Sequence, residues 1–155
     1  MKVIYLSANA DVGQVECYQL KNQNKFGTMY GLKSKLELVT SEDITEYSVS
    51  KNENGKLSLG VDCPQLQGAL NAITQGLNTQ NGFKFKPAKE RIYLKMSDEQ
   101  AASLPKNQKL RISVNIYGVF VQASTDLCFL QMELTTFKTY PLINFDGADD
   151  NAMFP

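Results

Sequence analysis

Residues 109–137 contain two runs in which apolar and polar side chains alternate, and this pattern constrains the fold most. A period of two is typical of a strand with one buried face. The phase changes at Gly118, which predicts a bulge or sharp bend, and the polar residues 123–126 predict a turn. The apolar positions are Leu110, Ile112, Val114, Ile116, Val119, Val121, Cys128, Leu130, Met132 and Leu134. We therefore expect a long, strongly bent antiparallel hairpin, of the kind that coils to close a small barrel.

Other segments predict shorter strands and a helix. The strands are expected at residues 3–6, 15–20, 28–40, 44–49, 56–61 and 83–96. Residues 21–27 are expected to be a polar loop, and the Asn-Gly pair at residues 54–55 predicts a hairpin turn. Residues 64–81 have apolar side chains at helical spacing, with Pro64 suited to the first turn. Ser97 and Gln100 match the capping box of a second, short helix.

The order of these elements indicates the fold class. Strands, one connecting helix and a long C-terminal hairpin predict a mainly β protein with an OB-fold-like antiparallel barrel. A β-sandwich is the alternative. We assign the barrel to residues 1–141, and we expect residues 142–155 to form a flexible acidic tail.

Composition excludes several functions. The 155 residues are 43% hydrophobic and 21% charged, as in a single soluble domain. The chain has no histidine, which rules out Ser/His and Cys/His nucleophile pairs. Its three cysteines include no Cys-x-x-Cys pair, which argues against a zinc site and for a reducing compartment, the cytoplasm. The apolar run at residues 3–6 is too short for a signal peptide or a membrane span. We expect no cofactor and no enzymatic activity.

The charges are unevenly distributed although the formal net charge is zero. Residues 142–155 carry three acids and no base, so the rest of the chain has a net charge of +3. Its positive charge gathers with aromatic residues in two places, the first basic segment (residues 17–36) and the second basic segment (residues 83–95). The first contains no acid, and the second has five bases against one acid. Such clusters matter more for a polyanionic partner than the total charge does.

Basic residues interleaved with aromatic ones are typical of proteins that bind single-stranded nucleic acid. A positive groove attracts the phosphates, and each unstacked base gains about 1–3 kcal/mol by stacking on a flat side chain. The first basic segment supplies the candidates Tyr18, Lys21, Lys25, Phe26, Tyr30, Lys33 and Lys35. The second supplies Lys84, Lys86, Lys89, Arg91 and Tyr93, and the polar positions of the hairpin add Arg111 and Tyr117.

Core packing is the alternative for each aromatic residue. For any one of them we favour packing over base stacking by roughly two to one. The tyrosines are better candidates than Phe83 and Phe85, because the tyrosines lie at polar positions or beside loops. Lysines on an exposed strand can also protect a sheet edge from aggregation. The prediction therefore depends on the two basic segments occurring together.

The C-terminal residues combine acids with an apolar end. The acids are Asp146, Asp149 and Asp150, and the apolar end is Met153, Phe154 and Pro155. In this layout the chain resembles the single-stranded DNA-binding proteins of bacteria, plasmids and phages, which join an OB-fold to an acidic tail with a hydrophobic tip. The resemblance implies that the tip recruits replication or repair proteins and that the tail competes with DNA for the basic groove. The chain departs from that family in having only three tail acids, a Phe-Pro end instead of Pro-Phe, and no tryptophan. A solvated end that only aids solubility is the alternative.

These observations predict a non-enzymatic protein that binds and protects single-stranded DNA, largely without regard to sequence, during replication or recombination. DNA is favoured over RNA because no RNA-specific motif is present. A homodimer or higher oligomer would lengthen the short groove of one copy. Two other classes stay open: a structural protein, such as a β-sandwich component of a phage virion, and a small metal-dependent nuclease. The nuclease would use Glu42, Asp43 and Glu46, or Asp149 and Asp150.

Overall fold

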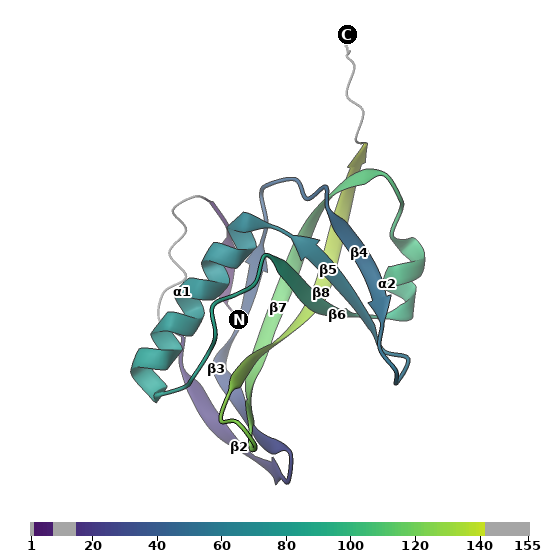
Figure 1. Ribbon diagram of the computed structural model, residues 1–155. Helices are drawn as coiled ribbons and strands as arrows, with labels where there is room; N and C mark the ends of the chain where they lie inside the picture. Colours follow the sequence, from purple (N-terminus) through teal and green to yellow (C-terminus); the bar gives the residue numbers. More distant parts are fainter. Residues whose placement is uncertain (1, 8–14, 142–155) are drawn as a thin grey trace.

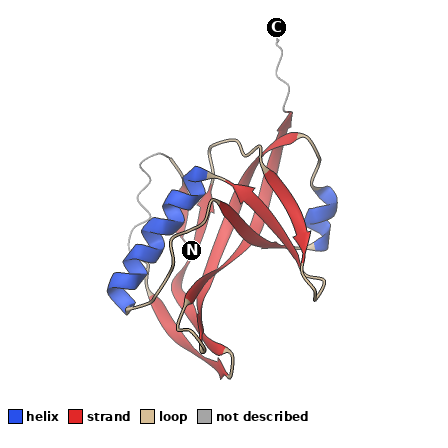
Figure 2. Cartoon of the chain, viewed as in Figure 1, coloured by secondary structure: helices blue, strands red, loops and turns tan. Residues whose placement is uncertain are grey.

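Eight strands of one sheet and two helices make up the computed structural model, which describes residues 2–7 and 15–141 (Figure 1). The elements are β1 (Lys2–Tyr5), β2 (Cys17–Asn24), β3 (Gly27–Val39), β4 (Tyr47–Lys51), β5 (Leu57–Asp62), α1 (Pro64–Asn81), β6 (Arg91–Met96), α2 (Asp98–Ser103), β7 (Gln108–Gln122) and β8 (Cys128–Pro141). The strand order is β1-β3-β7-β8-β6-β5-β4, and β2 pairs with β3. The expectation of a mainly β protein is confirmed (Figure 2).

The expected hairpin is the centre of the sheet. β7 and β8 pair antiparallel from Gln108 opposite Pro141 to Val121 opposite Cys128. The register shifts between Ile116 and Gly118, which confirms the predicted irregularity. Gly118 also lies against β3, where a Cβ atom would be 2.6 Å from the carbonyl oxygen of Tyr30. A side chain there would push the two strands apart, so the close approach requires glycine.

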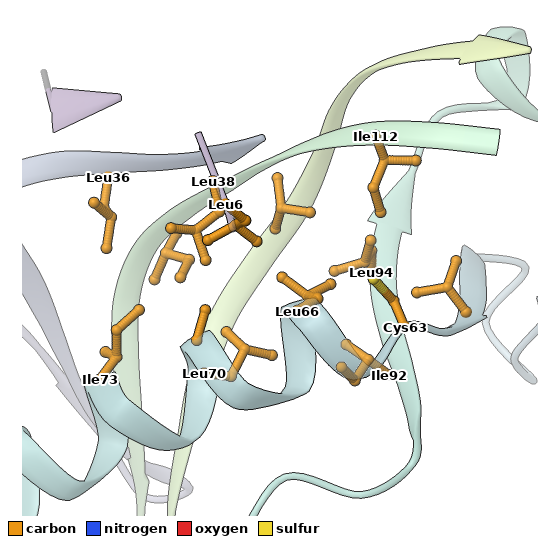
Figure 3. Packing of buried hydrophobic residues seen from close by; sticks show 14 of the residues in the cluster. Leu6, Leu36, Leu38, Cys63, Leu66, Leu70, Ile73, Ile92, Leu94 and Ile112 are labelled. Atoms are coloured by element: carbon orange, nitrogen blue, oxygen red, sulfur yellow. The ribbon is translucent and has the colours of Figure 1, made fainter. Parts of the chain in front are cut away.

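The core lies between the sheet and α1 (Figure 3). Alternate residues of β7 are buried, and α1 presents its apolar side to them. The buried side chains of α1 include Leu66, Leu70, Ile73 and Leu77. Burying each such side chain fully contributes about 1.5–3 kcal/mol relative to leaving it exposed. α1 spans the expected residues 64–81 and is capped by Gly82, whose φ of 68° suits glycine and whose N–H donates to the carbonyl oxygen of Asn78.

Two predicted local motifs are confirmed. Gly55 has a φ of 79° in the turn that joins β4 to β5, as an Asn-Gly turn requires. Ser97 caps α2 by accepting a hydrogen bond from the N–H of Gln100, and the Gln100 side chain accepts one from the N–H of Ser97. Neither described helix has the length and apolar character needed to cross a bilayer.

The expected closed antiparallel barrel is wrong. The pairing path ends at β1 on one side and β4 on the other, and these two strands do not pair in the described part of the chain. Two strand pairs, β1–β3 and β6–β8, are parallel. α1 covers the apolar face of the sheet, so the core is buried without closure. All described strands belong to one sheet, whereas a β-sandwich requires two facing sheets.

Two boundaries also differ from the prediction. β2 continues to Asn24 through the expected loop, because the Asn24 side chain accepts hydrogen bonds from the N–H groups of Phe26 and Gly27 and closes a tight turn. β6 begins only at Arg91, so residues 83–90 are not a strand. In that segment Pro87 has no N–H to donate, and side chains of α1 accept the N–H groups of Phe85 and Ala88.

Candidate nucleic-acid interface

β6 carries a group of basic and aromatic side chains on the side of the sheet that faces away from the core. Ile92 and Leu94 are buried, so the alternating residues Arg91, Tyr93 and Lys95 lie on the opposite face, which we call the outer face. Tyr93 is 58% exposed. A strand that places a flat ring between two bases on one face offers both contacts that a single-stranded polyanion needs.

The ring of Tyr93 covers a glycine of the neighbouring strand. Gly60 in β5 pairs with Tyr93, and a Cβ atom there would be 3.0 Å from Cε1 of Tyr93 and 3.1 Å from Cδ of Arg91. Arg91 is held by its Nε, 2.8 Å from Oδ1 of Asp62, and by donation from Nη1 to the carbonyl oxygen of Gly60 at 3.2 Å. Glycine at this position therefore lets the exposed ring lie close to the sheet beside a fixed guanidinium group.

Lys95 connects β6 to the β7 bulge. Its Nζ donates to the hydroxyl of Tyr117 at 2.7 Å and lies 5.4 Å from the ring centroid. Glu133 of β8 pairs with Lys95 in the sheet and accepts a hydrogen bond from Asn115 Nδ2 at 3.0 Å. The outer-face patch is defined as Arg91, Tyr93, Lys95 and Tyr117.

A second group of aromatic residues lies further along the same face. Phe120 of β7 and Phe129 of β8 are cross-strand neighbours, and we call them the aromatic row; Met29 of β3 pairs with Phe120 on its other side. Phe129 is 47% exposed, and Phe26 at the nearby β2–β3 turn is 65% exposed. Lys25 Nζ lies 5.1 Å from the Phe26 ring centroid. The outer face thus carries exposed rings in two places, Tyr93 on β6 and Phe129 near the start of β8.

The other candidates in the first basic segment are dispersed. The side chains of Tyr18 and Lys21 lie outside the described part of β2. The half-buried ring of Tyr30 packs edge-on against Phe83, with centroids 5.1 Å apart. Lys33 is exposed and pairs with Glu16 at 3.0 Å, and Lys35 is exposed on β3.

The second basic segment divides at Arg91. Lys84, Lys86 and Lys89 are exposed on residues 83–90, on the side of β8 that is covered by α1. Phe83 and Phe85 are partly buried, with ring centroids 6.1 Å apart. The preference for packing at these two phenylalanines therefore agrees with their positions.

Arg111 lies apart from the outer-face patch. Tyr117 is six positions further along β7, which is a distance of about 20 Å along a strand. Its Nε donates to Oδ1 of Asp43 at 2.7 Å, and its guanidinium carbon lies 5.1 Å above the Tyr140 ring. The hydrogen bond to Asp43 raises the pKa of Arg111, which keeps it charged.

Catalytic groups are weakly represented among the described residues, in which no cluster of three or more metal-binding side chains occurs. Asp43 is engaged by Arg111 and Lys109. All three cysteines are free; burial raises the pKa of Cys17 to about 11 and also raises the pKa of the Cys63 and Cys128 thiols. Such thiols are poor nucleophiles at neutral pH. The predicted tail residues, including Asp146 and Phe154, lie outside the described residues.

Sequence reasoning missed Lys95, Phe120 and Phe129 as members of this surface. The signal for Lys95 was present, since it shares the period-two phase of Arg91 and Tyr93. Phe129 likewise occupies a polar phase of its strand, with Gln131 and Glu133. Phe120 could not be placed, because its face depends on the register shift at the bulge.

Comparison of the chain with protein-family models, with curated proteins and with solved structures finds no match.

Proposed function

We propose that this protein binds single-stranded DNA without catalysing a reaction, and that the outer-face patch is its principal contact surface. The observation that carries this proposal is the exposed ring of Tyr93, held across Gly60 with Arg91 and Lys95 on the same strand face. The first basic segment is less suited to this role among its described residues: Tyr30 is half-buried against Phe83, and the exposed ring of Phe26, with Lys25 beside it, lies at the β2–β3 turn and not on a strand face between two bases.

The physical chemistry of the patch suits a single strand better than a duplex. Unstacked bases can lie on Tyr93, each gaining about 1–3 kcal/mol, whereas duplex bases already stack on one another. Arg91 and Lys95 are placed to contact phosphates, which adds affinity but no sequence preference. Because Asp62 and Gly60 already hold Arg91, less side-chain entropy is lost on binding. Such a protein would protect single strands during replication or recombination.

We infer further that the sheet is an open, elaborated form of the OB-fold. Its support is the long antiparallel set β3, β7 and β8 with a helix between two strand groups. The free cysteines suit a reducing compartment, and we place the protein in the cytoplasm, in a host cell if a phage encodes it. We assign recruitment of replication or repair proteins to the C-terminal tail, and a homodimer or higher oligomer would extend the binding surface.

The test is fluorescence anisotropy with labelled oligo(dT), its duplex and the matching RNA over a series of salt concentrations. We expect preferential binding of the single strand, with a log–log salt slope of about −0.7 per phosphate neutralised. Tyr93→Leu should weaken binding by about 1–3 kcal/mol, and Tyr93→Phe should retain most of the affinity. Tyr5→Leu on β1 is the control, because Tyr5 is 75% exposed but has no base placed beside it on its strand face. Equal effects of Tyr93→Leu and Tyr5→Leu would refute the assignment.

The aromatic row favours one other class, a structural or interaction protein. Phe129 of this row is exposed, as is Phe26 at the β2–β3 turn, and a protein partner could bury these rings. A protein of this class should show no tight binding to oligo(dT) at low salt, so the same titration distinguishes the two functions.

A further inference from the structure

A cleft opens where residues 83–90 bow away from β8. The segment meets β8 at Lys84 opposite Leu127, and β6 meets it again at Lys95 opposite Glu133. The two lysines are eleven positions apart along one chain segment, whereas their partners are six positions apart along β8. The longer segment cannot follow β8 over this distance, and the space left beneath it has a volume of about 370 Å³.

The walls of the cleft are apolar. α1 contributes Leu70, the bowed segment contributes Phe85 and Pro87, and β8 contributes Leu130 and Met132. The N–H groups of Phe85 and Ala88 donate to side chains of α1, which fixes the segment in its bowed position. A cavity of this size lies within the range of about 300–1,000 Å³ found for small-molecule sites.

The charge at the cleft is positive. Lys86 and Lys89 are part of its lining and are exposed to solvent, and no acidic residue lines it. The ion pairs found among the described residues involve other bases. An apolar interior beside two lysines suits a flat, weakly polar group with anionic neighbours, which describes a nucleobase between two phosphates.

The cleft is also continuous with the outer face. Phe129 lines it and belongs to the aromatic row. Phe129 is also 47% exposed, so a bound strand that passes over this ring on the outer face can reach the cleft.

We propose that the cleft receives one base of the bound single strand, with Lys86 and Lys89 contacting the flanking phosphates. This inference rests on the proposed function, and it adds a second contact site with a different character. The outer-face patch stacks bases in the open, whereas the cleft encloses a base between apolar walls. The few polar groups in the lining predict that any base is accepted.

The experiment combines cleft-filling variants with oligo(dT) in which one base at a time is removed as an abasic site. In the wild-type protein, one position should lose between about fivefold and a hundredfold in affinity when its base is absent. Filling the cleft with Ala88→Met should remove that position-specific loss, because the base can no longer enter. Tyr93→Leu should leave the loss at that position unchanged. Thr74→Met, from the α1 wall, is a second filling variant should Ala88→Met fail to fold, as judged by its melting temperature.

A charge test accompanies it. Lys86→Glu with Lys89→Glu should weaken oligo(dT) binding at least tenfold, and Lys51→Glu with Lys56→Glu is the matched control on the exposed β4–β5 turn. If the cleft variants bind every oligonucleotide as the wild type does, while Tyr93→Leu weakens binding, the cleft proposal is wrong and the proposed function stands. A cleft that instead takes an apolar side chain of a protein partner would give this result. If the wild type does not bind oligo(dT) at low salt, both proposals are wrong.

Discussion

The two basic segments resemble each other in composition but differ in how the backbone uses them. The first forms the paired β2–β3 hairpin, in which Lys33 lies in an ion pair and Tyr30 packs on Phe83. The second forms a continuous strand only from Arg91 onward, so its bases lie at two sites, on the outer face and at the cleft. Composition therefore locates a basic segment in the sequence, whereas strand pairing decides which of its side chains lie together.

The largest effect is expected from Gly27→Ala, which tests whether the first basic segment is held in place by close packing of β3 on β7. A Cβ atom at Gly27 would overlap the carbonyl oxygen of Val121 and would lie 2.6 Å from Cζ of Phe120. Gly27→Ala must therefore move β3 away from β7, and we expect it to lower the free energy of unfolding by about 3 kcal/mol in urea titrations.

Gly68→Ala is the control for that substitution. At Gly68 in α1 an added Cβ meets nothing within 4 Å, so alanine should raise the free energy of unfolding by about 0.5–1 kcal/mol. The changes in the free energy of unfolding at Gly27 and Gly68 must therefore have opposite signs. If Gly27→Ala is as well tolerated as Gly68→Ala, the close approach of β3 to β7 does not define the first segment.

The next prediction compares how much oligo(dT) affinity is lost when two basic residues are replaced in each segment. Arg91→Gln with Lys95→Gln should weaken oligo(dT) binding by about 2 kcal/mol and reduce the salt slope by about 0.7 for each phosphate that is no longer neutralised. Lys33→Gln with Lys35→Gln removes the same charge from the first segment and should change affinity by less than about 0.5 kcal/mol, because neither lysine belongs to the outer-face patch. If the Lys33, Lys35 variant loses more affinity for oligo(dT) than the Arg91, Lys95 variant, the first basic segment contains the binding groove.

Much of the local structure follows from the sequence, because local rules determine it. The alternation in β7 and β8, the Asn-Gly turn and the Ser97 capping box each depend on residues close in sequence. The parallel pairs and the open sheet could not be predicted, since they depend on contacts between distant segments. The strand expected at residues 83–90 does not form, because the N–H groups of Phe85 and Ala88 donate to side chains of α1 and not to a neighbouring strand.

In the candidate site, too, some features follow from the local sequence and others depend on contacts between distant segments. Arg91 and Tyr93 could be found from the sequence, because basic and aromatic residues alternate along one strand. The support that Gly60 gives to Tyr93 comes from another strand, and only the register reveals it. The cleft needs α1, residues 83–90 and β8 together, so no local pattern predicts it.

A smaller effect is expected from the tail. Deleting residues 144–155 removes no described core residue and should leave the fold intact, as measured by the melting temperature. Because a tethered acidic segment has a high effective concentration, its removal should tighten oligo(dT) binding by about 1 kcal/mol at low salt, and less as salt rises. The gain should vanish in the Arg91→Gln, Lys95→Gln background and persist in the Lys33→Gln, Lys35→Gln background. A gain independent of salt and background would exclude competition for the outer face.

The last prediction is an effect on stability that appears only at alkaline pH, and it concerns Cys17 at the start of the first basic segment. Burial raises its pKa to about 11 from an unfolded value near 9.0, because the partly buried site disfavours the thiolate. The folded state therefore binds the proton more tightly, and the resulting stabilisation is complete below pH 9 and lost as pH rises through about 11. Wild type should lose more stability than Cys17→Ala between pH 8 and 10.5 in urea titrations. The raised pKa values of Cys63 and Cys128 are common to both proteins and cancel in this difference. If the stability of the two proteins instead changes with pH in parallel, Cys17 is exposed to solvent. The start of the first basic segment would then not be packed on the core, although Leu32, the partner of Cys17 in β3, is buried.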